Sequence, residues 1–298
     1  MSRWRSLIIL IFPILALTLL YTPPTTAQFT PPPQPTYEQQ VLALVNQERW
    51  LNGRLPPLKG SAGLELAAKS HSQQMALRNF LDHCDFDTSA TFWQRIEQAG
   101  YTGWAVTGEN IAAGYKTPEE VVAGWMQSQR HRANILSTDF WEVGSGYMYQ
   151  ADDRPDVRQS DKQNCRADST SNGPYYHYWT QDFGRRSEVM PAIINREAFE
   201  TSHRKVSLYL YGAGWAQSVR VRNENGFWSA WQPFTPDLNW TLSNGSGLKM
   251  VFVEMSSGAD GAGTIRSASD SIWLRLAVTP TVVSSPTPHR LYLPVILR

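Results

Sequence analysis

The chain has 298 residues, a formal net charge of +1 at pH 7 and 42% hydrophobic residues. This near balance of charge does not favour binding to nucleic acid or to an anionic membrane, since both partners require a basic patch. The length predicts two domains of ordinary size and leaves the oligomeric state open.

The first 27 residues have the pattern of a secretory signal peptide. Arg3 and Arg5 form a basic start, the apolar stretch 7–20 follows, and Ala27 ends a small-residue cleavage site. The apolar stretch is shorter than the roughly 20 residues of a membrane-spanning helix. Removal of residues 1–27 leaves 25 basic against 26 acidic side chains, a net charge of −1. We expect a secreted, extracellular protein; retention at the cell surface is the alternative.

Helical periodicity begins after a proline-rich linker at residues 28–36. Apolar residues recur at helical spacing in residues 41–51 and again in residues 64–75. A shorter helix is expected at residues 91–100.

A fourth helix has the clearest start signal. Thr117 is its expected N-cap, Pro118 takes its first position, and Glu120 is placed to complete a capping box. His131 should then lie just beyond the last turn of this helix.

Strands are expected at residues 142–150 and 175–182, with a third leading into Glu109. A small antiparallel sheet with helices on both faces would bury these elements economically. The predicted fold class of this half is therefore α+β, a three-layer α-β-α sandwich. The polar insertion at residues 151–173 is expected to be a solvated hairpin loop.

After Arg186 the apolar pattern changes to period two, with turn signals between the runs. This pattern predicts an all-β sandwich over about residues 195–278. The region resembles immunoglobulin-like or fibronectin-like modules of bacterial surface proteins. Residues 279–298 form a Thr/Pro/Ser linker followed by an apolar C-terminal tail.

The chain has two cysteines, Cys84 and Cys165. An even count in an exported protein favours a disulfide, and closing so long a loop would contribute about 4 kcal/mol. Two unpaired thiols are the alternative. The Cys-x-x-Cys spacing of structural zinc sites is absent from the sequence.

Four short segments each carry an ionisable residue beside apolar or turn-forming residues; they are residues 81–83, 108–111, 131–136 and 141–144. Such groups are costly to bury unless they are paired or hold a metal, so a cluster of them indicates a site. The four residues are His83, Glu109, His131 and Glu142.

These segments, with the run Tyr178–Gly184, resemble the CAP superfamily of cysteine-rich secretory proteins, antigen 5 and pathogenesis-related protein 1. The resemblance covers about residues 37–186 and implies an α-β-α CAP domain. It also implies that the four residues form a tetrad in one open cleft. Arg130 departs from the family pattern, in which a glycine usually precedes the second histidine.

Three functions remain open at this point. The first is binding of a lipid or sterol, a peptide, or a divalent metal such as zinc held by His83 and His131. The second is a metal-assisted or acid–base hydrolase that acts on peptide or cell-wall material, with Glu109 and Glu142 as candidate catalytic residues. The third is an interaction protein, at the cell surface or cell wall, whose tetrad is purely structural.

Overall fold

The computed structural model describes residues 33–160 and 167–277. The predicted signal peptide, most of the proline-rich linker, Cys165 and the whole C-terminal linker and tail (residues 279–298) lie outside the described residues.

Helices form where the sequence pattern predicts them in the first half of the chain. Thr36 begins the first helix with a complete capping box, because its side chain accepts from the Gln39 amide and Gln39 Oε1 accepts from the Thr36 amide. Asn79 ends the second helix in the left-handed conformation. The first three helices are α1 (Tyr37–Leu51), α2 (Ala62–Arg78) and α3 (Phe92–Gln98).

Two short helices follow where the sequence predicts one helix and a loop. Thr117 caps α4 (Pro118–Gln127) through the Glu120 amide, but the Glu120 carboxylate accepts from the Lys116 amide, so the predicted capping box is incomplete. Ser128 is extended and interrupts the helix. The chain then forms α5 (Gln129–Leu136), so His131 lies inside a helix and not beyond one.

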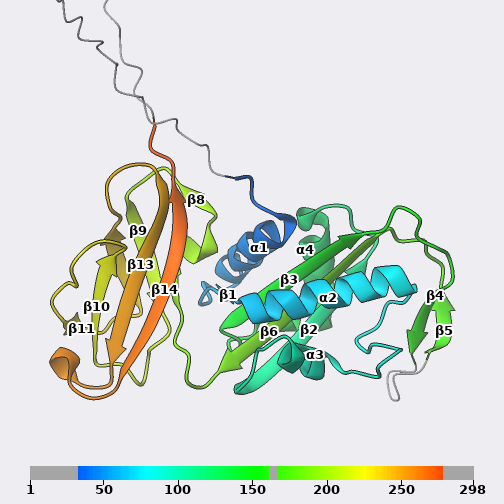
Figure 1. The fold of residues 1–298 in the computed structure, drawn as a ribbon, viewed down its shortest axis with the longest axis horizontal. Helices are drawn as coiled ribbons and strands as arrows, with labels where there is room; N and C mark the ends of the chain where they lie inside the picture. Colours follow the sequence, from blue (N-terminus) through cyan, green and yellow to red (C-terminus); the bar gives the residue numbers. More distant parts are fainter. Residues whose placement is uncertain (1–32, 161–166, 278–298) are drawn as a thin grey trace, which may run out of the picture. The chain divides into compact units, whose positions relative to one another are not determined.

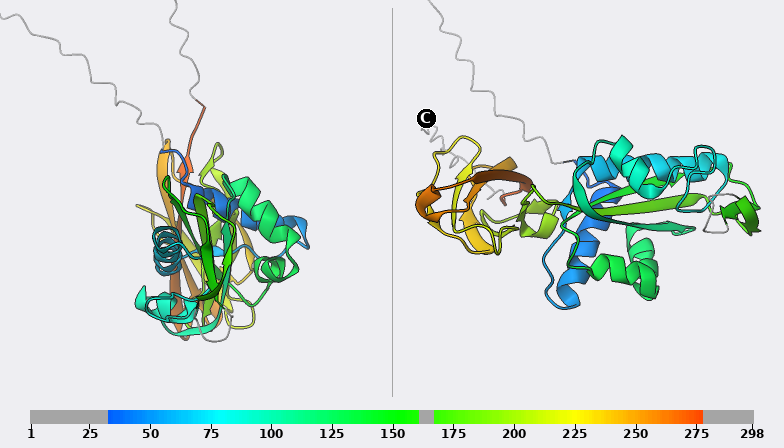
Figure 2. Two further views of the ribbon diagram at one scale, coloured as in Figure 1. Left: turned by 90° about the vertical axis from the view of Figure 1, so that its right-hand side faces the viewer. Right: turned by 90° about the horizontal axis from the view of Figure 1, so that it is seen from below.

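A four-stranded sheet lies between these helices. Its order is β1-β3-β6-β2, in which β1 pairs in parallel with β3 and the other pairs are antiparallel. Figures 1 and 2 show α2 along one face of this sheet, with α1 and α4 on the other. The strands are β1 (Lys59–Gly60), β2 (Trp104–Ala113), β3 (Glu142–Tyr149) and β6 (His177–Arg186).

The central strand β6 is buried on both faces. Trp179 and Phe183 join the core under α1 and α4. Thr180 faces α2, where its hydroxyl accepts from Ser72 Oγ at 3.0 Å. Gly144 and Gly146 of β3 let α2 approach closely, because a Cβ atom at either position would lie within 2.3 Å of the α2 backbone. This close contact sets the position of α2, and therefore of the loop that follows it.

The polar insertion contains a two-stranded hairpin of β4 (Val157–Ser160) and β5 (Ala167–Ser171). An isolated parallel bridge joins Arg158 to Phe80, just after α2. The insertion is therefore tied to the same loop that carries His83.

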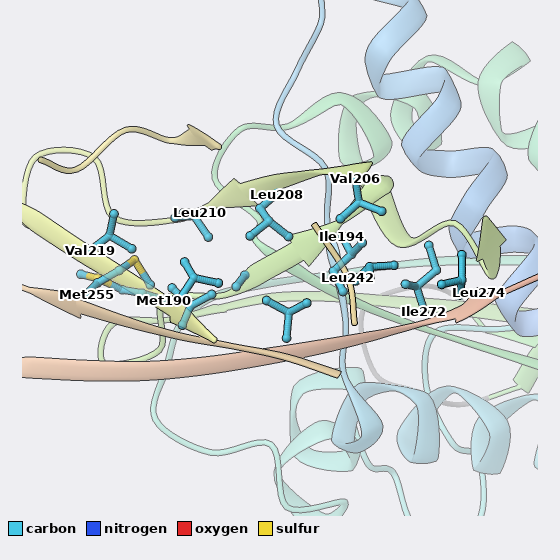
Figure 3. Close-up of a cluster of buried hydrophobic side chains, with 14 residues drawn as sticks. Met190, Ile194, Val206, Leu208, Leu210, Val219, Leu242, Met255, Ile272 and Leu274 are labelled. Carbon is cyan, nitrogen blue, oxygen red and sulfur yellow. The ribbon is translucent and has the colours of Figure 1, made fainter. Parts of the chain in front are cut away.

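The C-terminal region is β-rich, as its period-two pattern predicts. Two sheets, with strand orders β11-β10-β13-β14-β8 and β12-β9-β7, contribute to one apolar core (Figure 3). Val251, Val253 and Met255 point into this core, whereas Met250 is 37% exposed. The strands are β7 (Ala192–Ile194), β8 (Glu200–Thr201), β9 (Lys205–Leu210), β10 (Ser218–Asn223), β11 (Gln232–Pro233), β12 (Asp237–Thr241), β13 (Gly247–Ser256) and β14 (Ile265–Leu274).

Candidate functional site

Strand pairing places two acidic side chains opposite each other. Glu109 of β2 and Asp182 of β6 are register partners. Directly opposed residues of adjacent strands point to the same face of a sheet. Both carboxyl groups therefore lie on the α2 face, where Asp182 is 1% and Glu109 6% exposed.

His83 is held over this pair by the loop that follows α2. Asp82 fixes the loop, because its carboxylate accepts from the Cys84 amide at 2.9 Å and from the Ser160 hydroxyl at 2.7 Å. His83 Nδ1 then lies 2.8 Å from Glu109 Oε1. The His83 side chain is 52% exposed while that of Glu109 is 1% exposed. The imidazole therefore forms the solvent-facing part of the site.

Arg95 of α3 contacts both His83 and Glu109. Its Nη2 donates to Glu109 Oε2 at 2.6 Å, and its Nη1 donates to the His83 carbonyl at 2.8 Å. A charge-assisted contact of this length is strong in a buried setting. One carboxylate is thus shared between a buried guanidinium and an exposed imidazole.

The two opposed carboxyl groups differ in charge. Burial acts to raise the pKa of Glu109, but the charge of Arg95, with those of His71 and His83, brings it down to about 2. Burial and the nearby charge of Glu109 raise the pKa of Asp182 well above its usual value. Like charges at such short range disfavour double ionisation, so Asp182 keeps its proton to a higher pH than Glu109 does.

His131 approaches the cluster from α5. Asn134 Nδ2 donates to the Glu109 carbonyl, and Asn110 Nδ2 donates to the His131 carbonyl, each at 3.2 Å. These contacts tie α5 to the β2 segment that carries Glu109. The His131 backbone is thus fixed beside Asn110, the residue that follows Glu109 in β2. Burial lowers the pKa of His131, and the charge of His83 lowers it further.

Glu142 makes a different set of contacts. Tyr101 Oη donates to Glu142 Oε2 at 2.8 Å, and Arg186 Nη2 donates to Oε1 at 2.5 Å. Glu142 is in register with Gly184, two residues along β6 from the partner of Glu109. The Tyr101 ring occupies the space above Gly184, where a Cβ atom would lie 2.5 Å from its hydroxyl.

One cleft shared by all four predicted residues stays a prediction. His83 and Glu109 are in direct contact and form one group with His131 of the adjoining α5, whereas the contacts of Glu142 are with Tyr101 and Arg186. We refer to this group, with Arg95 and Asp182, as the histidine site.

Sequence reasoning missed Arg95 and Asp182 as members of the histidine site. Asp182 lies inside the run Tyr178–Gly184. It is two residues from Thr180 in an expected strand, so the two side chains point to the same face. Its partner could be found only from the β2–β6 register. Arg95 carried a weaker signal, a charged residue on the inner side of a short helix.

Two further predictions concern the cysteines and a metal. None of the described cysteines is a free thiol, and Cys165 lies outside the described residues, so its pairing with Cys84 stays a prediction. The described residues include no group of three or more His, Cys, Asp or Glu side chains arranged to hold a metal ion. The site predicted at His83 and His131 has two protein ligands, fewer than the three of such a group.

The histidine site lies within a segment that matches a known family. Residues 42–183 match the CAP family model, described as the cysteine-rich secretory protein family. No helix in the described part of the chain is both long and apolar enough to cross a membrane.

Two proteins of Bacillus subtilis (strain 168) are similar to this segment. One, named uncharacterized protein YkwD, is 41% identical over 112 residues, which are 38% of this chain and 42% of that protein. The other, named uncharacterized membrane protein YlbC, is 32% identical over 113 residues, 38% of this chain and 32% of that protein. The chain thus matches less than half the length of either relative.

Two solved structures are also similar. An extracellular protein containing an SCP domain from Bacillus anthracis str. Ames is 26% identical with a TM-score of 0.38, over 50% of this chain and 40% of that one. An outer surface protein from Borrelia burgdorferi is 21% identical with a TM-score of 0.38, over 49% of this chain and 90% of that one.

Proposed function

We propose that this is an exported protein that binds a ligand at the histidine site, without turnover. The 2.8 Å contact between His83 Nδ1 and Glu109 Oε1 carries the proposal. It fixes the ring and directs the other nitrogen, Nε2, away from the buried carboxylate. A half-exposed imidazole oriented by a buried carboxylate is a prepared ligand-binding group.

The proposed ligand is a divalent metal ion such as zinc, bound by His83 and His131. Zinc-binding histidines usually donate their second ring nitrogen to a carboxylate or carbonyl, and the pairing of His83 with Glu109 has this form. Arg95 already neutralises Glu109, so the carboxylate serves to orient His83 and not to bind the ion. Two imidazoles leave other coordination positions for water or an external ligand.

A lipid, sterol or peptide is the second ligand class. A pocket of about 360 Å³ adjoins the histidine site at Arg95 and Asp85, along α2. That volume falls within the range of small-molecule pockets. An acyl chain or a peptide side chain would enter there, with its polar end at Arg95.

Burial of the carboxylates argues against the hydrolase alternative. The Glu109 side chain is 1% exposed and engaged by Arg95, and the Glu142 side chain is 4% exposed and engaged by Arg186. A general acid or base must reach the proton it transfers. Neither carboxylate meets this condition, which leaves His83 as the exposed titratable group.

The export signal and the β-rich C-terminal region complete the proposal. We propose that residues 195–278 form an immunoglobulin-like module that presents the first domain outside the cell, near a surface or cell-wall component. Two packed sheets with one shared core support a sandwich.

Mass spectrometry of metals and organic molecules that co-purify with the full chain tests the proposal. We expect a divalent metal or one organic ligand in the wild type and its loss from the double variant His83→Ala, His131→Ala. His203→Ala is the matched control, because His203 is exposed and its ring nitrogen Nδ1 lies 2.9 Å from the Ser202 hydroxyl. Equal retention by all three proteins would show that the histidines do not form the ligand site.

A further inference from the structure

A pocket at the end of α1 has two arginines on its walls. Its volume is about 390 Å³, and its lining includes Trp50, Arg54, Arg196, Tyr209 and Asp237. The pocket lies away from the histidine site and shares none of its residues. Its volume falls within the range of pockets that bind small molecules.

Both guanidinium groups lie against the same indole ring. The Cζ of Arg196 is 3.2 Å and that of Arg54 is 5.2 Å from the centroid of Trp50. In the described part of the chain, neither guanidinium makes an ion pair or a side-chain hydrogen bond. Each carries five donors in a planar fork that matches a carboxylate or a phosphate. Two guanidinium groups that line one pocket, with no acceptor for them among the described residues, form an arrangement that can bind an anion.

The backbone holds both arginines in an unfavourable conformation. Arg54 has φ 54° and Arg196 has φ 56°, in the left-handed region that side chains other than glycine rarely adopt. Hydrogen bonds impose it: the Arg54 amide donates to the Trp50 carbonyl at 2.9 Å, and Asn46 donates to the Arg196 carbonyl at 3.1 Å. Strain of this kind persists where the surrounding structure over-determines it, often at binding sites.

A third arginine adds positive charge behind the pocket. Arg49 is fully buried and donates to the Pro56, Ile135 and Ser137 carbonyls, and no carboxylate in the described residues pairs with it. Among the described residues, no acceptor satisfies its Nη2. Burial lowers the pKa of Arg196, and the nearby charge of Arg54 lowers it further while Asp237 opposes the shift. Arg54 and Arg196 on the pocket walls, with Arg49 behind them, outnumber the single carboxylate of Asp237, and this excess of positive charge favours an anion.

We propose that this pocket is a second ligand site, which binds a small molecule through an oxyanion, a carboxylate or a phosphate, held between Arg54 and Arg196. Tyr209 and Asp237 line the same pocket and are placed to hydrogen-bond to hydroxyl groups of the ligand. Asp237 also repels the oxyanion and so lowers the affinity.

Calorimetry on the full chain tests this site with inorganic phosphate, glucuronate and uncharged glucose as probes. We expect phosphate or glucuronate to bind with one site per chain and glucose not to bind. The preferred probe shows whether the ligand carries a phosphate or a carboxylate. Absence of binding by both anions at up to about 10 mM, or equal binding of glucose and glucuronate, would overturn the proposal.

Variants locate the binding. Arg54→Gln and Arg196→Gln should each weaken the preferred anion about tenfold or more, because each removes a charge-assisted hydrogen bond. Arg185→Gln is the matched control, since Arg185 stacks over Trp141 at 5.4 Å outside the pocket. Equal loss in the control would overturn the assignment.

Asp237→Asn distinguishes loss of the site from loss of folding. It removes a repulsive charge, so anion affinity should rise, an outcome that misfolding cannot produce; an unchanged or lower affinity would contradict the charge argument. The double variant His83→Ala, His131→Ala should bind the anion like the wild type. Loss of binding in that variant would place the anion at the histidine site and overturn the proposal.

Discussion

Glu109 and Asp182 face each other across the pairing of β2 with β6, and their pKa values are shifted in opposite directions, down for Glu109 and up for Asp182. The asymmetry arises because Arg95 donates to Glu109 and to the carbonyl of His83, while Asp182 lies deeper with one oxygen that has no hydrogen-bond partner among the described residues. The surroundings of the pair therefore favour the charged form of Glu109 and the neutral form of Asp182.

This asymmetry predicts different effects of two amide substitutions. Asp182→Asn should change the free energy of unfolding by less than about 1 kcal/mol, because the amide replaces a protonated carboxyl group. Glu109→Gln should cost about 3 kcal/mol or more, because it leaves the buried Arg95 without its anion. Urea unfolding at neutral pH measures both. A cost for Asp182→Asn equal to that of Glu109→Gln would mean that Asp182 is charged.

The buried position of His71 leads us to expect a loss of folding stability in mild acid. Burial lowers its pKa to about 4, so the unfolded chain takes up a proton near the usual histidine pKa while the folded chain resists it. The contribution of His71 to stability is therefore present above about pH 6.5 and is lost as the pH falls toward 4, by about 3 kcal/mol.

The measurement is the difference between the wild type and His71→Gln across this pH range. The comparison is needed because burial raises the pKa of Glu197 to about 7, which makes stability fall as the pH rises over an overlapping range. His71→Gln should lose the part of the free energy of unfolding that depends on acid pH. His203→Gln, at an exposed position, should keep that dependence. Parallel pH curves for the wild type and His71→Gln would contradict the shift.

Gly146 should not tolerate a methyl group. A Cβ atom there would lie 2.3 Å from the backbone of Ala68 and Lys69 in α2, so Gly146→Ala should cost about 3 kcal/mol or more. Gly226→Ala is the control, because its nearest neighbour would lie 3.7 Å away, and it should change stability by no more than about 0.5 kcal/mol. Thermal unfolding compares the two variants; similar midpoints would mean that α2 can move away from the sheet.

Exported protein should contain a bond between Cys84 and Cys165. Intact-mass measurement after alkylation without reductant should show no added groups, and reduction should allow two. Reduction should also lower stability by about 4 kcal/mol, because it releases a long closed loop. Two alkylated cysteines before reduction would contradict the prediction.

Local sequence signals predict the elements well. The threonine at position 117 starts α4, and the alternation of Val251, Val253 and Met255 identifies the buried face of β13. Each of these signals depends on residues within a single helix or strand, so it can be recognised in the sequence alone. The exception is Ser128, whose extended backbone separates α4 from α5 without a proline or glycine to mark the break.

The site could be predicted only in part, because its geometry depends on strand register. His83 and Glu109 do meet, but Glu142 aligns with Gly184 and Tyr101 fills the space above that glycine. A shift of two residues along β3 separates neighbouring clusters, and no local pattern encodes it. The pocket at Arg54 and Arg196 was also hidden, since these residues lie 142 positions apart and only tertiary structure joins them.

Zinc titration calorimetry at about pH 7.5 and about pH 5.5 tests the central claim most directly. Protonated imidazole cannot bind a metal ion, so affinity should fall between the two conditions. At the higher pH, His131→Ala and His83→Ala should each bind zinc much more weakly than the wild type. His203→Ala should bind zinc as the wild type does. Equal affinity at both pH values, or no change in His131→Ala, would contradict the account.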